Sequence, residues 1–170
     1  QALPVTPRLI TATWFPRRRP DEFTLERTPV AIRVGEPAFS SFPTDHVVGI
    51  KVVANGKFTD VADPEGLPRS VGIDDITRAS AAVRETLPGV TPDPVRVGTY
   101  CDLFTPDGHA FVGPPTDGSA VVLATGFCGH GFKLAPAFGR AVARLATDKQ
   151  TDHDLSFLHP SRLHSTVDDH

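Results

Sequence analysis

The sequence predicts an α+β fold, in which a mostly antiparallel sheet with a flanking helix is followed by a strand, a glycine-rich turn and a second helix. Three observations support this prediction. Short segments rich in β-branched and aromatic residues fill the first 60 positions, and Pro, Gly, Asn or Asp bounds them, as is typical of hairpins. A later segment repeats apolar residues at the helical period. Near the carboxyl end, glycines separate the last strand from the last helix.

Two groups of strands are expected. The first group lies at residues 8–15, 30–34, 37–42 and 47–53. Asn55-Gly56 then suits a tight turn. The second group lies at residues 94–101, 103–104, 109–113 and 120–125, with a turn at Thr105-Pro106-Asp107-Gly108. Because residues 120–125 are continuously apolar, they predict a central, buried strand.

Two helices are expected, one in each half of the chain. The first begins near Asp74, because apolar residues recur there every three or four positions until Pro88-Gly89 ends the pattern. Those residues are Ile76, Ala79, Ala82, Val83 and Leu87. The second helix covers residues 133–146 and packs on the strand at 120–125. We expect residues 1–112 to form one domain and residues 113–170 to complete another.

The composition is typical of a globular domain, with 39% hydrophobic and 22% charged residues in a chain of 170. A net charge of −3 provides no basic field for nucleic acid or an anionic membrane. No apolar run approaches the roughly 20 residues that span a bilayer, so a cytoplasmic location is expected. The chain contains no methionine and begins with Gln1, which leads us to expect that its natural start has been lost.

Cysteine and histidine residues give little support for a disulfide framework or a metal site. Cys101 and Cys128 are the only cysteines, too few for a disulfide scaffold. The histidines of the tail have no compact ligand spacing; they are His153, His159, His164 and His170. We expect free thiols, or one thiol that takes part in chemistry, and no bound metal.

The glycine-rich turn between residues 120 and 146 is the most informative segment. Gly126, Gly129 and Gly131 allow backbone to approach a ligand closely where the helix begins. A helix start offers unpaired N–H groups and the positive end of the helix dipole, which together stabilise an anion or an electron-rich ring edge. The order Gly-X-X-Gly-X-Gly differs from the dinucleotide fingerprint Gly-X-Gly-X-X-Gly. By itself, the turn is equally compatible with a tight structural corner.

The residues around this turn resemble a known signature. Residues 126–133 read Gly-Phe-Cys-Gly-His-Gly-Phe-Lys, similar to the Gly-Phe-Ser-Gly-His-Gly-Phe-Lys signature of the monomeric sarcosine oxidase and N-methyl amino-acid oxidase family, with Cys128 in place of serine. This family belongs to the D-amino-acid-oxidase-like superfamily. Weaker matches extend the resemblance over roughly the whole chain. They are Leu3-Pro4-Val5, Phe42-Pro43, Gly49-Ile50-Lys51, Thr105-Pro106-Asp107 and the helix from Gly139 to Ala146.

The resemblance implies that the chain is the carboxy-terminal part of an FAD-dependent oxidase, and that residues 113–170 complete its FAD domain. In the family the glycine turn lies along the pyrimidine edge of the flavin. The residues carried over as flavin contacts are Gly126, Phe127, Gly129, His130, Gly131, Phe132 and Lys133. The amino-terminal fingerprint that would hold the ADP half of FAD is absent from the sequence, so we expect a missing segment or a companion chain to supply it.

Two lysines carry the implied chemistry. The resemblance implies that Lys133 binds the substrate carboxylate, and that Lys51 lies over the flavin and activates oxygen. Taken without the resemblance, Lys133 suits an exposed helix start and Lys51 suits an outward strand position. His130 is compatible with a structural role in the turn as well as a direct one.

Cys101 and Asn55 mark departures from the family pattern. Family members commonly bind flavin covalently through a cysteine in Cys-X-Tyr-Thr-X-Thr, whereas Cys101 lies one position closer to the turn and the tyrosine is missing. Because a one-residue slip in a strand reverses the face, either a bulge compensates or Cys101 is a buried strand residue and the flavin is not covalently bound. Asn55 aligns with a substrate-contacting histidine and Ser40 with a tyrosine, so we expect a reshaped substrate pocket.

The implied reaction is oxidation of the C–N bond of a secondary amine or N-methyl amino acid to an imine, with O2 reduced to H2O2. One alternative is a glycine or D-amino-acid oxidase or dehydrogenase of the same superfamily, in which a dehydrogenase would not need Lys51. The other alternative is a non-catalytic subunit or fragment, whose glycine turn merely packs a helix.

Overall fold

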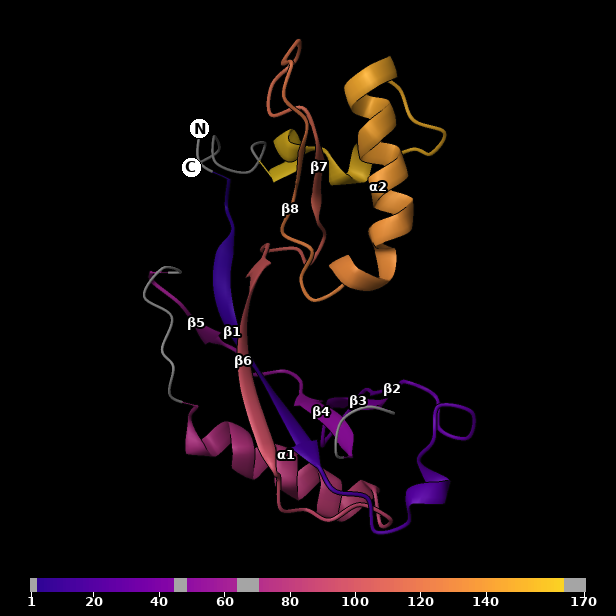
Figure 1. Cartoon of the computed structure of the whole chain (residues 1–170). Coiled ribbons are helices and arrows are strands. Elements are labelled where there is room, and N and C mark those ends of the chain that lie inside the picture. Colours follow the sequence, from indigo (N-terminus) through magenta and orange to yellow (C-terminus); the bar gives the residue numbers. More distant parts are fainter. Residues whose placement is uncertain (1–2, 45–48, 64–70, 164–170) are drawn as a thin grey trace. The chain divides into compact units, whose positions relative to one another are not determined.

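The computed structural model describes residues 3–44, 49–63 and 71–163 (Figure 1). The chain divides into two compact units, residues 9–101 and residues 1–8 with 102–170. Strands β1 (Thr6–Phe15) and β6 (Arg96–Phe104) pair with each other. The prediction of separate domains at 1–112 and 113–170 stays a prediction.

The unit of residues 9–101 is built on an antiparallel sheet, as predicted. Its strand order is β2-β3-β4-β1-β5, and β6 also pairs with β1. The remaining strands are β2 (Ala31–Arg33), β3 (Phe39–Pro43), β4 (Ile50–Ala54) and β5 (Thr59–Asp60). Every second residue of β3 is buried, the alternation expected of a sheet with one covered face. The four strands predicted in the first 60 residues are confirmed, with ends that differ by at most two residues where both are described; Val47 and Val48, at the start of the fourth predicted strand, lie outside the described residues.

Helix α1 (Ile73–Thr86) covers one face of this sheet (Figure 1). Its buried residues Ala79, Ala82 and Val83 belong to one core with residues of β1, β3 and β4, namely Phe15, Phe39, Ile50 and Val52. Two alanines on the packing face leave room for the larger side chains of the sheet. The helix predicted from the apolar spacing is therefore confirmed, and it ends two residues before Pro88.

The other unit combines a small hairpin with a helix. Strands β7 (Phe111–Gly113) and β8 (Leu123–Thr125) pair antiparallel, and α2 (Gly131–Asp148) packs beside them (Figure 1). Two short 3-10 helices, η2 (Ser156–Leu158) and η3 (Pro160–Leu163), follow, and η1 (Pro20–Glu22) lies in the first unit. The core consists of Ala110, Val112 and Leu158, with α2 contributing Phe138, Val142 and Leu145.

Two details of the predicted strands are wrong. The apolar segment 120–125 forms a strand only from Leu123, and that strand is half-buried with Ala124 exposed, not buried and central. Among the described residues, β8 has β7 as its one neighbour, so one side of the strand lacks the covering that a central strand has. Residues 96–104 form a single strand, whereas a break near residue 102 was expected.

Candidate functional site

The glycine turn before α2 contains three residues with a positive φ. Gly126 has φ +69°, Cys128 φ +53° and Gly129 φ +81°. A Cβ on Gly126 would lie 2.7 Å from Cγ2 of Thr105, whereas a Cβ on Gly129 would meet nothing within 4 Å. Gly126 thus packs against the protein, and Gly129 faces open space where a ligand can approach.

Hydrogen bonds attach this turn to the end of β6. The N–H of Cys128 donates to the carbonyl oxygen of Leu103 at 3.1 Å. The Oδ2 atom of Asp102 accepts from the N–H of Gly129 at 2.5 Å, and its Oδ1 atom accepts from the N–H of Leu103 at 2.8 Å. Asp102 was not among the predicted site residues, because nothing in the local sequence indicates a partner 27 positions away.

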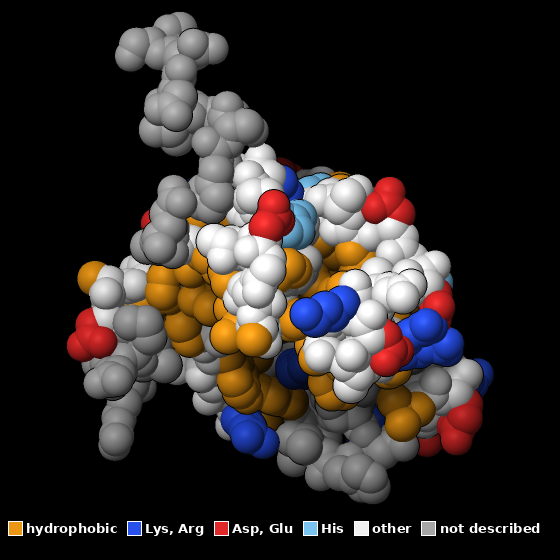
Figure 2. Space-filling model, turned by 90° about the horizontal axis from the view of Figure 1, so that it is seen from above, with side chains coloured by type: hydrophobic (Ala, Val, Ile, Leu, Met, Phe, Trp, Pro, Cys, Tyr) orange, Lys and Arg blue, Asp and Glu red, His pale blue; other side chains and the backbone are white. Residues whose placement is uncertain are grey.

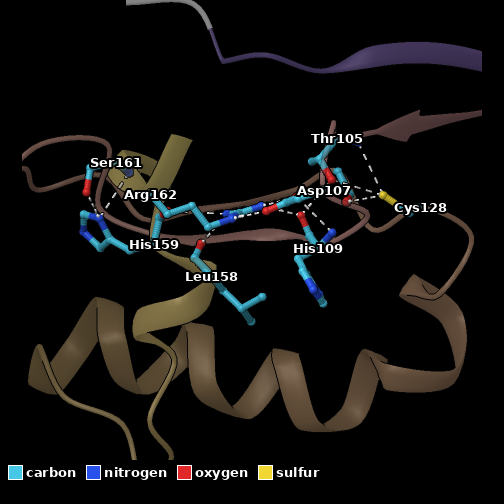
Figure 3. Close-up of polar contacts among 9 residues, drawn as sticks. Thr105, Asp107, His109, Cys128, Leu158, His159, Ser161 and Arg162 are labelled. Carbon is cyan, nitrogen blue, oxygen red and sulfur yellow. Dashed lines mark hydrogen bonds and ion pairs between the residues drawn. The ribbon is translucent and has the colours of Figure 1, made fainter. Parts of the chain in front are cut away.

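The thiol of Cys128 is held by the turn that follows β6. Its Sγ atom accepts from the N–H of Thr105 at 3.4 Å, and it lies 3.4 Å from Oγ1 of the same residue (Figure 3). The thiol also reaches the carbonyl oxygen of Gly126 at 3.2 Å. These contacts hold Cys128 in the left-handed backbone region, which residues with a Cβ rarely adopt.

The start of α2 is exposed and carries no side-chain cap. His130 is the N-cap residue and makes no capping hydrogen bond. Phe132 is 97% exposed and Lys133 is exposed too. The first N–H groups of a helix have no partners within it, so this end can stabilise negative charge. Of the seven predicted residues of the segment 126–133, Gly129, His130, Phe132 and Lys133 are exposed at this helix start, whereas Gly126 is buried and Phe127 packs against the core.

His130 lies between a positive and a negative side chain. Desolvation of the ring lowers the pKa of His130 from its ordinary value, the charge of Lys133 lowers it further, and the charge of Asp102 opposes both. The lowered pKa favours the neutral imidazole over the charged one. Lys133 contributes an exposed ammonium group at the same helix start.

Lys51 occupies a half-buried position in β4, opposite Trp14 on β1 and Phe42 on β3. Its Nζ atom lies 4.1 Å from the ring centroid of Phe42, a cation–π contact. Burial lowers the pKa of Lys51 from its ordinary value. This environment differs from that of a lysine directed fully into solvent, and the oxygen-activating role stays a prediction.

Asn55 and Cys101 belong to the same unit as Lys51. The side chain of Asn55 donates from Nδ2 to Oγ of Ser40 at 2.9 Å, so the structure joins two of the residues at which the sequence departs from the family pattern. Cys101 is half-buried within β6 with a free thiol, and its neighbour Tyr100 is 51% exposed. Substrate contact by Asn55 and flavin attachment at Cys101 stay predictions.

Neither a metal-binding cluster nor a membrane-spanning helix is present among the described residues. Within residues 3–44, 49–63 and 71–163, no three His, Cys, Asp or Glu side chains converge as metal ligands would. Neither helix in these ranges is long and apolar enough to cross a membrane.

A second cluster, which the sequence did not predict, lies on the other side of Thr105. Arg162 in η3 donates from Nε and Nη2 to both carboxylate oxygens of Asp107, at 2.8 and 3.0 Å (Figure 3). Its guanidinium also stacks 4.1 Å from the ring centroid of Phe111. The hydrogen bond from Arg162 holds the pKa of Asp107 well below its usual range.

The depressed pKa of Asp107 predicts a specific dependence of stability on pH. The carboxylate stabilises the fold above the pKa of the unfolded chain, about 3.9, and this contribution is lost as the pH falls toward the lower folded pKa. Asp107→Asn should therefore lower the Tm most at pH 6 and progressively less down to pH 2, in thermal unfolding followed by circular dichroism. Asp117→Asn, on an exposed turn, is the control. A deficit that stays constant from pH 6 to pH 2 would contradict the ion pair.

Comparison with known proteins places this turn in a family. Residues 4–145 match the family described as FAD dependent oxidoreductase. Monomeric sarcosine oxidase from Bacillus sp. (strain B-0618) is 29% identical over 133 residues, which cover 77% of this chain and 34% of that protein. Peroxisomal sarcosine oxidase from Homo sapiens is 29% identical over 125 residues, 72% of this chain and 32% of that protein. The chain spans about a third of the length of these relatives.

Solved structures show the same fold. L-Proline dehydrogenase from P. horikoshii matches with a TM-score of 0.77 at 21% identity, covering 97% of this chain and 42% of that chain. NikD, an amino acid oxidase of nikkomycin biosynthesis, matches with a TM-score of 0.71 at 22% identity, covering 93% and 42%. Because the family match covers most of its length, this chain belongs to the FAD-dependent oxidoreductase family.

Proposed function

We propose that the chain is the carboxy-terminal portion of an FAD-dependent oxidase that acts on a secondary amine or N-methyl amino acid. The C–N bond becomes an imine, so the substrate loses one hydrogen from carbon and one from nitrogen. Both electrons and both protons end on O2, which gives H2O2. The observation that carries the proposal is the open glycine turn at the uncapped start of α2, in a chain whose relatives include sarcosine oxidases.

The residues of the turn fit the edge of a flavin ring. Gly129 leaves open space beside the backbone, and the exposed helix start provides N–H groups and a positive dipole end. When bound, FAD supplies a two-electron acceptor for the hydride of the substrate. Gly126, Phe127, Gly129, His130, Gly131, Phe132 and Lys133 would form one wall of its site. A helix start in this position favours the negative charge of reduced flavin.

Lys133 would bind the carboxylate of an amino-acid substrate. It is exposed at the helix start, and a lysine ammonium can bind a carboxylate as a point charge. Lys51 would act on oxygen. Its ammonium group is partly desolvated beside Phe42, and a fixed positive charge in such surroundings stabilises negative charge developing on O2.

The remainder of the flavin-binding domain would cover the start of α2. Phe132 is 97% exposed and Leu134 is 40% exposed, and Ala135 and Ala137 beside them are exposed as well. The face in Figure 2 shows hydrophobic side chains gathered in several groups with Lys and Arg side chains between them. Large exposed apolar side chains on a helix indicate a contact surface. The proposed partner of this surface is a further segment, or a companion chain, that supplies the ADP-binding half of the site.

Replacing Lys51 tests the oxidase reaction. In the complete flavin-loaded protein, Lys51→Met should slow H2O2 production from amine and O2 by about 100-fold or more, because a developing negative charge loses its preorganised partner. Lys57→Met, an exposed lysine after the same strand, should leave the rate unchanged. Peroxide is measured with a coupled peroxidase assay. Equal rates in both variants would remove the role of Lys51, and substrate oxidation by an artificial acceptor without peroxide would favour the dehydrogenase alternative.

Replacing Lys133 tests recognition of the carboxylate. Lys133→Met should raise the KM for an N-methyl amino acid by about 10-fold to 100-fold, since a charge-assisted hydrogen bond contributes roughly 1.5–3 kcal/mol. The KM for an amine of the same size without a carboxylate should change little. Lys149→Met, at the opposite end of α2, is the matched control. A similar rise for both substrates would show that Lys133 does not bind the carboxylate.

Cys101 is the candidate for a covalent flavin bond. If the bond forms, yellow flavin absorbance should remain with the complete protein after acid precipitation, and Cys101→Ser should release it into the supernatant. Cys128→Ser should retain it. Flavin that is released from the unsubstituted protein would rule out the covalent bond while leaving the proposed FAD site intact. A complete protein with no visible flavin spectrum would instead favour the non-catalytic alternative.

A further inference from the structure

We propose that Arg162 is a positioning residue, which braces the turn at Thr105–Gly108 and through Thr105 fixes the Cys128 corner of the glycine turn. The brace is a property of the described structure. Its consequence for the flavin rests on the proposed function.

All three nitrogen atoms of the Arg162 guanidinium donate hydrogen bonds. The guanidinium binds both carboxylate oxygens of Asp107, at 2.8 and 3.0 Å. Its Nη2 atom also donates to the carbonyl oxygen of His109 at 2.6 Å, and Nη1 donates to that of Leu158 at 3.1 Å. The side chain is 12% exposed and stacks on Phe111. Only a planar fork of donors can satisfy this geometry, so a lysine cannot reproduce it.

The carbonyl oxygen of His109 connects the brace to Thr105. It accepts from Nη2 of Arg162 at 2.6 Å and from Oγ1 of Thr105 at 2.9 Å (Figure 3). One acceptor therefore fixes both the guanidinium and the Thr105 hydroxyl. Thr105 is itself buried, with an exposed fraction of 7%, and a side chain held on two sides in a packed region has little freedom to move.

Thr105 in turn holds the glycine turn at two points. Its N–H donates to Sγ of Cys128 at 3.4 Å, and its Cγ2 atom fills the space beside Gly126, where a Cβ would lie 2.7 Å away. Cys128 has a φ of +53°, which is unfavourable for a residue with a Cβ. Such a conformation persists only where the surroundings impose it, and here those surroundings include Thr105.

The series of contacts runs from η3 to Cys128 in the glycine turn. It passes from Arg162 through Asp107 and His109 to Thr105, and from there to Cys128. An ion pair with a merely stabilising role would affect global unfolding alone. A positioning role additionally predicts that the Cys128 thiol becomes more accessible in the folded protein when the brace is removed.

Thiol alkylation in the complete protein tests this directly. Arg162→Met should raise the rate at which iodoacetamide modifies Cys128 by about tenfold or more, because the thiol loses the Thr105 contacts. Arg162→Lys should give an intermediate rate. Arg140→Met, which removes an exposed ion pair between Arg140 on α2 and Asp152 after the helix, should leave the rate unchanged. Peptide mass spectrometry separates Cys128 from Cys101, and circular dichroism verifies that each variant is folded.

The flavin supplies a second readout. In the flavin-loaded protein, Arg162→Met should shift the visible flavin spectrum and lower the midpoint potential, because the helix start no longer has a fixed position against the ring. Arg140→Met should change neither property. A purely structural role would leave both properties unchanged in the folded variant.

The outcomes separate this inference from the proposed function. An unchanged alkylation rate in folded Arg162→Met overturns the brace, whatever the flavin does. A raised rate in a complete protein that contains no flavin supports the brace and contradicts the proposed function. If Arg162→Met does not fold, Asp107→Asn removes the ion pair while retaining the size of the side chain. It should raise the rate in the same direction, and a rate equal to that of the unsubstituted protein would overturn the inference.

Discussion

The attachment of the glycine turn to the end of β6 is the constraint on which the rest of the site depends. The N–H of Cys128 bonds to Leu103, and the carboxylate of Asp102 accepts from Gly129. These two bonds determine where the chain turns from β8 into α2, and so where the first N–H groups of the helix point. A helix start can stabilise a ligand only if it is held in one place.

The two sides of the turn have opposite requirements. The side of Gly126 is packed against Thr105, where a methyl group would collide, while the side of Gly129 is open. Charge follows the same division. The carboxylate of Asp102 accepts a hydrogen bond from the backbone of Gly129, and the lowered pKa of His130 favours its neutral form, so the positive charge of this segment comes mainly from Lys133. The side of Gly126 thus holds the turn in place, and the side of Gly129 is open to a ligand.

Local patterns were sufficient for most secondary structure. Strands β1 to β4 and helix α1 were predicted within a few residues, because alternation and helical spacing reflect which side chains face the core, whereas the two-residue strand β5 was not predicted. The strand at 120–125 was wrong in length and burial. A continuous apolar run indicates that its side chains are buried in the finished protein, but it does not indicate which segment buries them. The same holds for the exposed apolar residues at the start of α2.

The sequence by itself determined the type of site, through the segment Gly126–Lys133, whose chemistry depends on neighbouring residues in one turn. Only the tertiary structure decided what holds that turn. The bond from Gly129 to Asp102 joins residues 27 positions apart, and the Arg162–Asp107 pair joins residues 55 apart. Asp102, Asp107 and Arg162 have no periodic pattern that indicates a partner, because each contact arises only after strands and helices have packed. Local sequence encodes local conformation, whereas such contacts are consequences of the whole fold.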